Sequence, residues 1–179
     1  MDERLKELFI EEIKLQCQYA MSAHSALISA IQKGDTRTTF FYVHAFLSHV
    51  GNVSKLFWPI RSQSRARGEF LRNELGVSDS FLIKQRDPRN HLEHYDERLD
   101  DWASSSQRHN IADMNIMPRS AIQGIDPSDF MRNLDPTTLA FYFTDEDYDL
   151  HGFASEMEAI RQSTEAWLEK RDPWGRPLQ

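Results

Sequence analysis

The first 57 residues carry the pattern that most limits the fold, because their apolar side chains recur at helical spacing with hardly a break. Residues 3–33 bring an apolar side chain to one face every three or four positions, which predicts one long amphipathic helix. Gly34 is a typical helix stop, and Asp35 or Thr36 can cap a second helix, which ends before Pro59. We therefore expect two long antiparallel helices joined by a short turn, with the more apolar second helix at the centre of a bundle.

Three further helices are predicted along the chain. A polar, basic connection leads to a short helix at about 69–75, which Gly76 ends. Residues 87–89 read Asp-Pro-Arg, a helix-start signal in which the aspartate caps the helix and the proline takes its first position. That helix runs to about residue 102, and a last amphipathic helix is expected at about 153–170.

Residues 103–150 differ from the rest of the chain, since they are rich in polar residues and show no long helical period. Short strands are expected here, at 110–117, 121–125 and most clearly 139–143, with a turn or a further strand at 145–149. The sequence thus predicts a mostly α protein of one domain over 1–179. Its fold class is an antiparallel helical bundle with a small β or irregular insert before the last helix.

Composition excludes several classes of protein. The 179 residues carry a formal net charge of −7 and contain a single cysteine, Cys17, inside an apolar helical pattern. A disulfide framework and a cysteine metal cluster are therefore excluded. The chain has no apolar run of about 18 residues, and its acidic beginning is unlike a secretory signal, so we expect a cytoplasmic protein that does not enter a membrane. The overall acidity argues against non-specific binding of nucleic acid.

The negative charge is concentrated in the C-terminal half of the chain. Residues 59–90 hold seven basic and four acidic side chains, whereas residues 91–179 hold eight basic and eighteen acidic ones. Ordinary variation on a solvated surface accounts for this as well as a function does. The basic island nevertheless leaves room for a local RNA site, because its arginines and lysine can follow a phosphate backbone.

The segment 86–102 gathers histidines, arginines and carboxylates around a thin apolar stripe. On a helix of 100° per residue, the expected buried stripe is Leu92, Tyr95, Leu99 and Trp102. A polar strip on one flank of that stripe contains Asn90, His91, His94 and Arg98. Arg89 lies on the other flank, roughly 140° from His94. The two converge only if a second copy of the helix faces the first, or if the first turn is irregular.

Arg89 lies in the first turn of the expected helix, where free backbone N–H groups and the helix dipole favour an anion. A guanidinium at that position is suited to bind phosphate. Asn90 and His94 are four residues apart, so their side chains can act together. Arg89 can equally pair with Glu93 in a surface salt bridge, and His94 can be a half-buried histidine bonded to a neighbouring helix.

The sequence Arg-Asn-His-Leu-Glu-His at residues 89–94 resembles the R-x4-6-H motif of HEPN-domain proteins (higher eukaryotes and prokaryotes nucleotide-binding). The polar residue after the arginine and the place of the motif in a late helix also fit that family. The resemblance covers about 120 residues of helix, and the insert at 103–150 lies outside it. It implies an all-helical bundle that pairs as a homodimer, with the two motif helices facing each other across a cleft.

The resemblance also implies an activity. In many HEPN proteins this cleft is a metal-independent ribonuclease site that needs no cofactor, found in toxin–antitoxin, phage-defence and RNA-processing systems. By that analogy Arg89 and His94 are the catalytic pair and Asn90 is an auxiliary residue. Arg86, His91, Arg98 and Tyr95 are the expected substrate-binding residues, although core packing is the simpler role for Tyr95. An antitoxin or a nucleotidyltransferase-type partner is implied for such a protein.

The residue types suit this chemistry. Metal-free cleavage of RNA uses the neighbouring 2′-hydroxyl to attack the phosphate, so a group must move a proton near neutral pH, as histidine does. A cation must also stabilise the charge that develops on the phosphoryl oxygens, as arginine does. Two symmetry-related histidines could divide the acid and base roles.

Two other functions stay open. His44 or His49, with His91, His94 and nearby acids, could form a metal site in a helical bundle, although no zinc spacing is present. The chain could also be a non-catalytic helical dimer that binds a partner or a nucleotide. For the histidines at 24, 44 and 49, which lie in apolar helices, the simplest expectation is that they are hydrogen-bonded core or interface residues.

Overall fold

The computed structural model describes residues 2–85, 95–106, 110, 112–144 and 146–171. These residues form the helices α1 (Glu3–Gln32), α2 (Thr36–Phe57), α3 (Arg65–Leu75), α5 (Tyr95–Ser105) and α6 (Leu150–Glu169). They also form the strands β1 (Asn115–Ile116), β2 (Arg132–Leu134), β3 (Ala140–Phe143) and β4 (Glu146–Asp149). The molecule is therefore mostly helical with a small four-stranded sheet.

The hairpin of α1 and α2 has the boundaries that the sequence predicts. Asp35 caps α2, because its carboxylate accepts a hydrogen bond from the backbone N–H of Thr38 at 3.1 Å. Gly34 precedes that cap with a backbone φ of +67°, a conformation that glycine adopts without strain. The turn between the two helices is consequently only three residues long.

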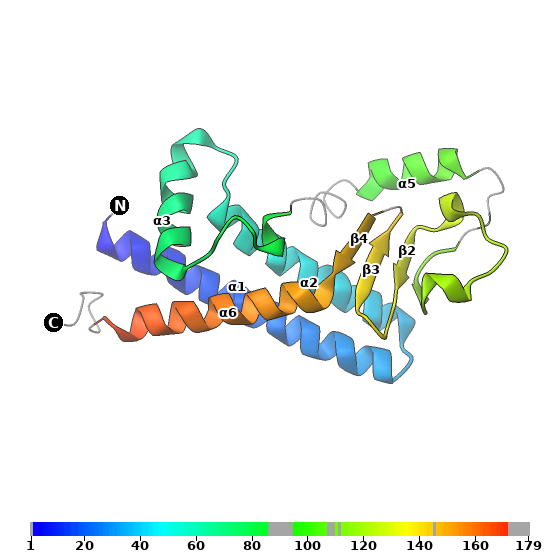
Figure 1. The fold of residues 1–179 in the computed structure, drawn as a ribbon, viewed down its shortest axis with the longest axis horizontal. Helices are drawn as coiled ribbons and strands as arrows, with labels where there is room; N and C mark the ends of the chain where they lie inside the picture. The colour runs from blue at the N-terminus through cyan, green and yellow to red at the C-terminus, as the bar shows by residue number, and fades with distance from the viewer. Residues whose placement is uncertain (1, 86–94, 107–109, 111, 145, 172–179) are drawn as a thin grey trace.

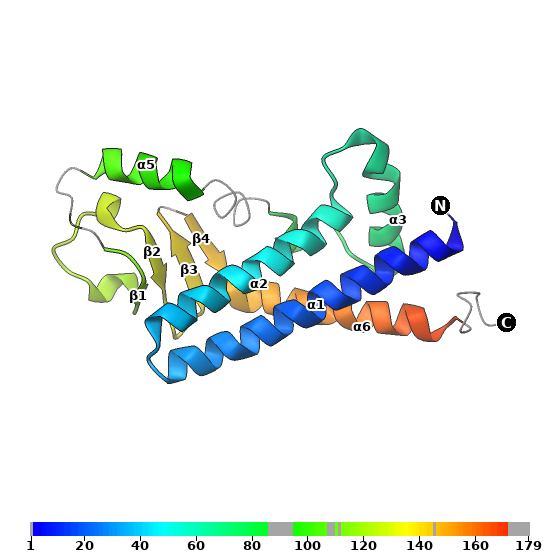
Figure 2. The ribbon, with the colours of Figure 1, turned by 180° about the vertical axis from the view of Figure 1, so that it is seen from behind.

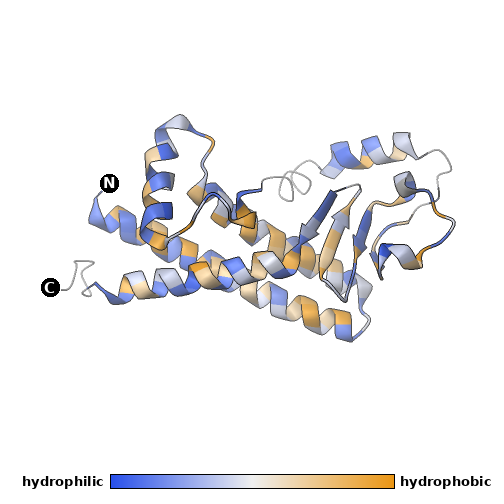
Figure 3. Cartoon of the chain, in the orientation of Figure 1, coloured by the Kyte–Doolittle hydropathy of each residue, from blue (hydrophilic) through white to orange (hydrophobic). Residues whose placement is uncertain are grey.

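Helix α6 lies along α1 and completes a three-helix core (Figures 1 and 2). Apolar side chains from the three helices are fully buried against one another, among them Ile13, Leu27, Phe46, Phe153 and Ile160. The hydropathy of the ribbon follows this arrangement, with apolar residues facing the contact between helices and polar residues facing away (Figure 3). None of the helices in the described part of the chain has both the length and the apolar character needed to cross a membrane.

The sheet packs near the end of the bundle where α1 turns into α2 (Figures 1 and 2). Its strand order is β1-β2-β3-β4, with β1 parallel to β2 and the other neighbours antiparallel. Phe141 of β3 is 1% exposed and meets Phe40 of α2 edge to face, with ring centroids 6.4 Å apart. The sheet thus shares the hydrophobic core of the helices and is not a separate appendage.

Helices α3 and α5 lie at opposite ends of the molecule (Figure 1). Helix α3 packs beside the beginning of α1 and the end of α2, and it ends at Gly76, whose φ is +68°. Helix α5 lies next to the sheet, where the ring of its first residue, Tyr95, meets that of Phe143 edge to face at 6.4 Å.

The described residues of the insert at 103–150 form four strands, which are shorter than the strands that the sequence predicts. The strand expected at 139–143 is confirmed as β3, that at 145–149 as β4, and β1 lies within the expected 110–117. The strand expected at 121–125 is wrong, because Gly124 has a φ of +81° that interrupts any extended run. Strand β2 was not predicted.

Two helix boundaries differ from the prediction. The last helix begins at Leu150 instead of about residue 153, because Asp149 caps it by accepting the N–H of Gly152 at 2.8 Å. Helix α3 begins at Arg65, four residues before the predicted start, and thus includes part of the expected polar connection. The helix predicted from residue 87 is described from Tyr95 onward and extends to Ser105.

Candidate functional site: a pocket between α2, α5 and β2

Five of the seven predicted site residues lie outside the described residues, namely Arg86, Arg89, Asn90, His91 and His94. The structure describes the other two, Tyr95 and Arg98, at the beginning of α5. The convergence of Arg89 with His94 across a dimer therefore stays a prediction.

The predicted apolar stripe of α5 is narrower than expected. Trp102 is buried and Tyr95 is partly buried, but Leu99 is 38% exposed. Helix α5 lies at the edge of the fold, and Leu99 is left partly exposed there. Arg98 keeps 43% of its side chain exposed and lies 3.9 Å from Asp101, a surface pair of small energetic value.

Tyr95 lines a pocket together with three residues from other parts of the chain. His44 and Ser48 come from α2 and Arg132 from β2, and the pocket has a volume of about 410 Å³. The elements are brought together because Phe141 and Phe143 lie on the same face of β3, where Phe141 meets Phe40 of α2 and Phe143 meets Tyr95 of α5. The site is thus made by the contact of the helical bundle with the insert.

An ion pair with Asp113 holds Arg132 in place. The Nε of Arg132 donates to Oδ1 of Asp113 at 2.8 Å, Nη2 donates to Oδ2, and the backbone N–H of Arg132 also donates to Oδ1 at 3.2 Å. The arginine side chain is only 12% exposed, and the hydrogen bond with Asp113 raises its pKa. Arg132 therefore carries a fixed positive charge whose position is set by a two-point contact.

Aromatic rings surround the same guanidinium. Its central carbon lies 5.4 Å from the ring centroid of Tyr95 and 6.0 Å from that of Phe40. Both distances allow a cation–π attraction. Tyr95 therefore packs as the sequence predicts, against Phe143, and at the same time forms one wall of the pocket.

His44 contributes a polar atom that the fold does not satisfy. Its Nε2 is buried and has no hydrogen-bond partner among the described residues. Burial lowers the pKa of the imidazole, the positive charge of Arg132 lowers it further, and Asp113 acts in the opposite direction. Ser48 uses its hydroxyl to donate to the carbonyl oxygen of His44 at 2.8 Å. A neutral imidazole with an unused nitrogen thus faces an arginine.

The other histidines of the bundle differ from one another. Nδ1 of His49 lies 2.8 Å from Oε1 of Gln16, so the prediction of a bonded histidine is confirmed there. His24 packs its ring against Phe46 at 5.5 Å, but its Nε2 is buried without a partner in the described part of the chain, as is that of His44. The prediction of bonded core or interface histidines is therefore not confirmed for these two nitrogens. The described residues contain no group of three His, Cys, Asp or Glu that could hold a metal ion.

Much of the predicted basic island serves the fold. Arg67 stacks on the ring of Phe9 at 4.8 Å, and Arg72 donates to the carbonyl oxygen of Phe57. Lys84 pairs with Asp79 at 3.1 Å. Among the described residues of the island, Arg61 and Arg65 are exposed.

Sequence reasoning missed Arg132, the charged residue that lines the pocket, and Asp113, which holds Arg132 in place. They lie 19 positions apart in a segment without helical period, and nothing in the local sequence links them. No local signal points to them, because the three-residue strand β2 that carries Arg132 is recognised only from its pairing with β1 and β3. His44 was noticed, but as a core histidine or a metal ligand.

Comparison with protein-family models, with curated proteins and with solved structures gives no match for this chain. The resemblance to HEPN proteins therefore rests on the sequence motif alone and stays a prediction. Any functional conclusion has to come from the residues themselves.

Proposed function

We propose that the chain is a metal-independent ribonuclease of the HEPN type, with Arg89 and His94 as its catalytic pair and Asn90 as an auxiliary residue. The observation that supports this most directly is the position of the pocket. Tyr95, which follows the motif in the sequence, lies against Arg132 and shares the pocket with His44. An RNA strand that reaches residues 89–94 would thus meet a second arginine and an aromatic wall close by.

The chemistry needs no metal. His94 removes the proton from the 2′-hydroxyl, and Arg89 stabilises the negative charge that develops on the phosphate. A second copy of the chain supplies the general acid that protonates the leaving 5′-oxygen. The proposal therefore requires a homodimer, and in a toxin–antitoxin or phage-defence setting the activity would be controlled by a partner protein.

A cleavage assay tests the proposal. Purified protein is incubated with a panel of structured and single-stranded RNAs in EDTA, and the products are resolved on denaturing gels. We expect cutting by the wild type and loss of at least about a hundredfold in rate for Arg89→Ala or His94→Ala. Arg37→Ala and His151→Ala are matched controls, because both residues are exposed on helices of the bundle. Equal inactivity of all five proteins, or loss of cutting by EDTA, contradicts the proposal.

A non-catalytic helical dimer is the second candidate function. A shallow, mostly apolar hollow of about 470 Å³ lies between α1 and α2 and includes Tyr19, Ala23 and Tyr42. Phe41, on the outer side of α2, is 66% exposed. Sedimentation of wild type and Phe41→Asp measures whether this apolar surface holds two copies together. Dimer formation without any RNA cleavage favours the second candidate over the first.

A further inference from the structure

We propose that the pocket formed by His44, Ser48, Tyr95 and Arg132 binds a phosphate group. This goes beyond the proposed cleavage activity, because it concerns binding by residues outside the motif and holds whether or not the chain cuts RNA. The phosphate can belong to a mononucleotide or to the end of an RNA strand.

The size and lining of the pocket suit a small ligand. Its volume of about 410 Å³ lies within the range of roughly 300–1,000 Å³ found for small-molecule sites. Two walls are polar or cationic, from α2 and β2, and the third is the ring of Tyr95. This mixture of an aromatic surface with a few convergent polar groups is typical of ligand sites.

The guanidinium of Arg132 has N–H donors left for a second anion besides the carboxylate of Asp113. A guanidinium has five N–H donors in a rigid plane, and Asp113 takes two of them, one on Nε and one on Nη2. The remaining three are not used by Asp113. Because the aspartate already fixes the side chain, a phosphate oxygen can bind those donors with little further loss of side-chain freedom.

His44 supplies the complementary group. Its imidazole lines the pocket together with Arg132 and gains a positive charge once the ring is protonated. The charged groups that face His44 are Arg132 and Asp113, and Arg132 opposes protonation. A bound phosphate offsets the charge of Arg132 and therefore favours the protonated imidazole. Phosphate binding is therefore coupled to the uptake of a proton by His44.

The carboxylate of Asp113 repels a bound anion. This allows a second test, in which the expected change in affinity has the opposite sign. The carboxylate binds the Nε and Nη2 edge of the guanidinium and does not line the pocket, so it orients Arg132 but also repels phosphate. Removal of its charge should strengthen binding, whereas removal of the arginine should abolish it. A merely structural ion pair predicts no such pair of opposite effects.

The direct measurement is an NMR titration of the histidine rings in the full chain. The pKa of His44 is measured without ligand and with inorganic phosphate, and we expect it to rise when phosphate is present. His49 is the internal control, because it lies on the same helix, is bonded to Gln16 and does not line the pocket. Equal shifts of His44 and His49, or no shift of His44, overturn the proposal.

Variants extend the test to affinity, measured by calorimetry with inorganic phosphate. We expect Arg132→Leu to weaken binding at least about tenfold and Asp113→Asn to strengthen it several-fold. Arg119→Leu is the matched control, since this arginine also stacks on two rings of the insert, at 5.1 Å from Phe130 and 5.2 Å from Tyr142, but does not line the pocket. Weakening by Asp113→Asn, or equal weakening by Arg119→Leu, overturns the proposal.

Three further ligands distinguish the two possible sources of the phosphate, a mononucleotide and the end of an RNA strand. A nucleoside 5′-monophosphate that binds more tightly than inorganic phosphate, with Tyr95→Leu removing the gain, identifies a mononucleotide whose base stacks on the ring. A short RNA with a 5′-phosphate that binds better than both the monophosphate and its 5′-hydroxyl counterpart identifies an RNA end. Circular dichroism of each variant confirms that the fold is kept, and Asp113→Asn, which keeps the size and shape of the side chain, serves if Arg132→Leu does not fold.

Discussion

Glu156 of α6 accepts a hydrogen bond from the backbone N–H of Leu82 at 2.7 Å, across 74 positions of sequence. The other oxygen of the same carboxylate accepts the N–H of Ile83 at 3.0 Å. These two donors begin the short 3-10 turn Leu82–Lys84, which has no side-chain cap from its own segment. A single carboxylate on the last helix therefore fixes the chain just before the segment that carries the motif.

Substitution of Glu156 by alanine is expected to lower the free energy of unfolding by roughly 2–3 kcal/mol, because two partly buried N–H groups lose a charged acceptor. Urea denaturation followed by circular dichroism measures this change. Glu169→Ala is the control, since Glu169 is exposed near the end of the same helix, and it should change stability by less than about 0.5 kcal/mol. Equal effects of the two substitutions would show that the Glu156 contact contributes nothing of its own.

Gly68 sits at the closest approach of α3 to the end of α2. A Cβ atom at this position would lie 2.5 Å from the carbonyl oxygen of Phe57 and 2.6 Å from Cδ of Pro59. Both are parts of the backbone or of a rigid ring, so neither can move aside easily. Gly68→Ala should therefore destabilise the protein by about 1–3 kcal/mol, although alanine favours a helix more than glycine does.

Thermal unfolding of Gly68→Ala beside Asn73→Ala separates packing from helix propensity. Asn73 is exposed in the same helix, so alanine there should leave the melting temperature unchanged or raise it slightly. A rise in melting temperature for both variants would show that α3 can move away from α2 without loss.

Cys17 is a buried thiol in the middle of α1, and it is the one cysteine of the chain. Burial raises its pKa to about 12, so almost no thiolate exists at neutral pH. We expect a thiol reagent at pH 8 to label the folded protein about a thousandfold or more slowly than the unfolded chain, since labelling requires unfolding. The labelled fraction should rise with urea along the same curve as the loss of helical signal. Fast labelling without denaturant would show that α1 opens locally.

Sequence patterns predicted the helices well and the insert poorly, for a physical reason. A helix is specified by contacts three or four residues apart, so residues 3–33 and 36–57 reveal it locally. Strand β2 is specified by its pairing with β1 and β3, where Leu134 lies opposite Phe141, and three residues give no local period. The strand was therefore invisible until its partners were known.

The candidate site was predictable only in part. Tyr95 was recognised from its place on the helical wheel, because the wheel follows from spacing alone. Arg132 and Asp113 acquire their role through a contact that depends on how the insert folds back, which spacing does not encode. Leu99 was predicted to be buried and is partly exposed. The helical wheel gives the order of side chains around α5, but it does not give the width of the face that the rest of the protein covers.

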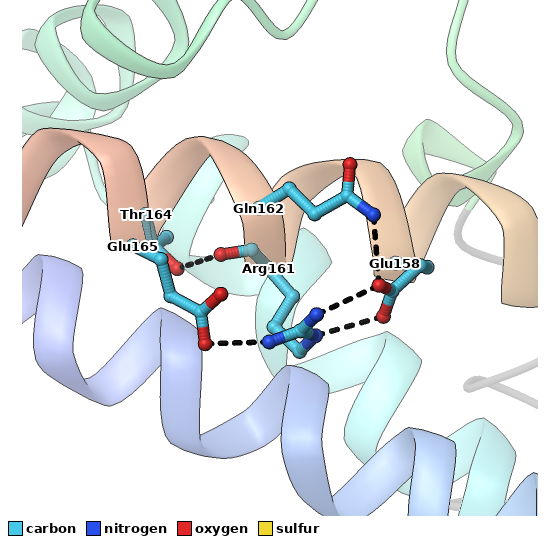
Figure 4. A network of polar contacts seen from close by, with 5 residues as sticks. All are labelled: Glu158, Arg161, Gln162, Thr164 and Glu165. Carbon is cyan, nitrogen blue, oxygen red and sulfur yellow. Dashed lines mark hydrogen bonds and ion pairs between the residues drawn. The ribbon is translucent and has the colours of Figure 1, made fainter.

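The network around Arg161 on α6 predicts a specific dependence of stability on pH. Arg161 donates from Nε and Nη2 to the two oxygens of Glu158, both at 2.8 Å, and Gln162 donates to Glu158 as well (Figure 4). These hydrogen bonds, with that of Arg161 the strongest, lower the pKa of Glu158 from 4.5 to about 2. The folded state therefore binds its proton less readily than the unfolded chain, and the contribution to stability is complete above pH 4.5.

This contribution should disappear as the pH falls from 4.5 towards 2. Glu158→Gln removes the titrating group, so the difference in unfolding free energy between wild type and variant should be greatest near neutral pH and should shrink through that window. Urea denaturation at several pH values measures it, with Glu169→Gln as a control that shows no such trend. Because the network is near the surface, about 1 M salt should reduce the difference at neutral pH. A difference that is constant between pH 2 and pH 7 would show that Glu158 stabilises α6 without its charge.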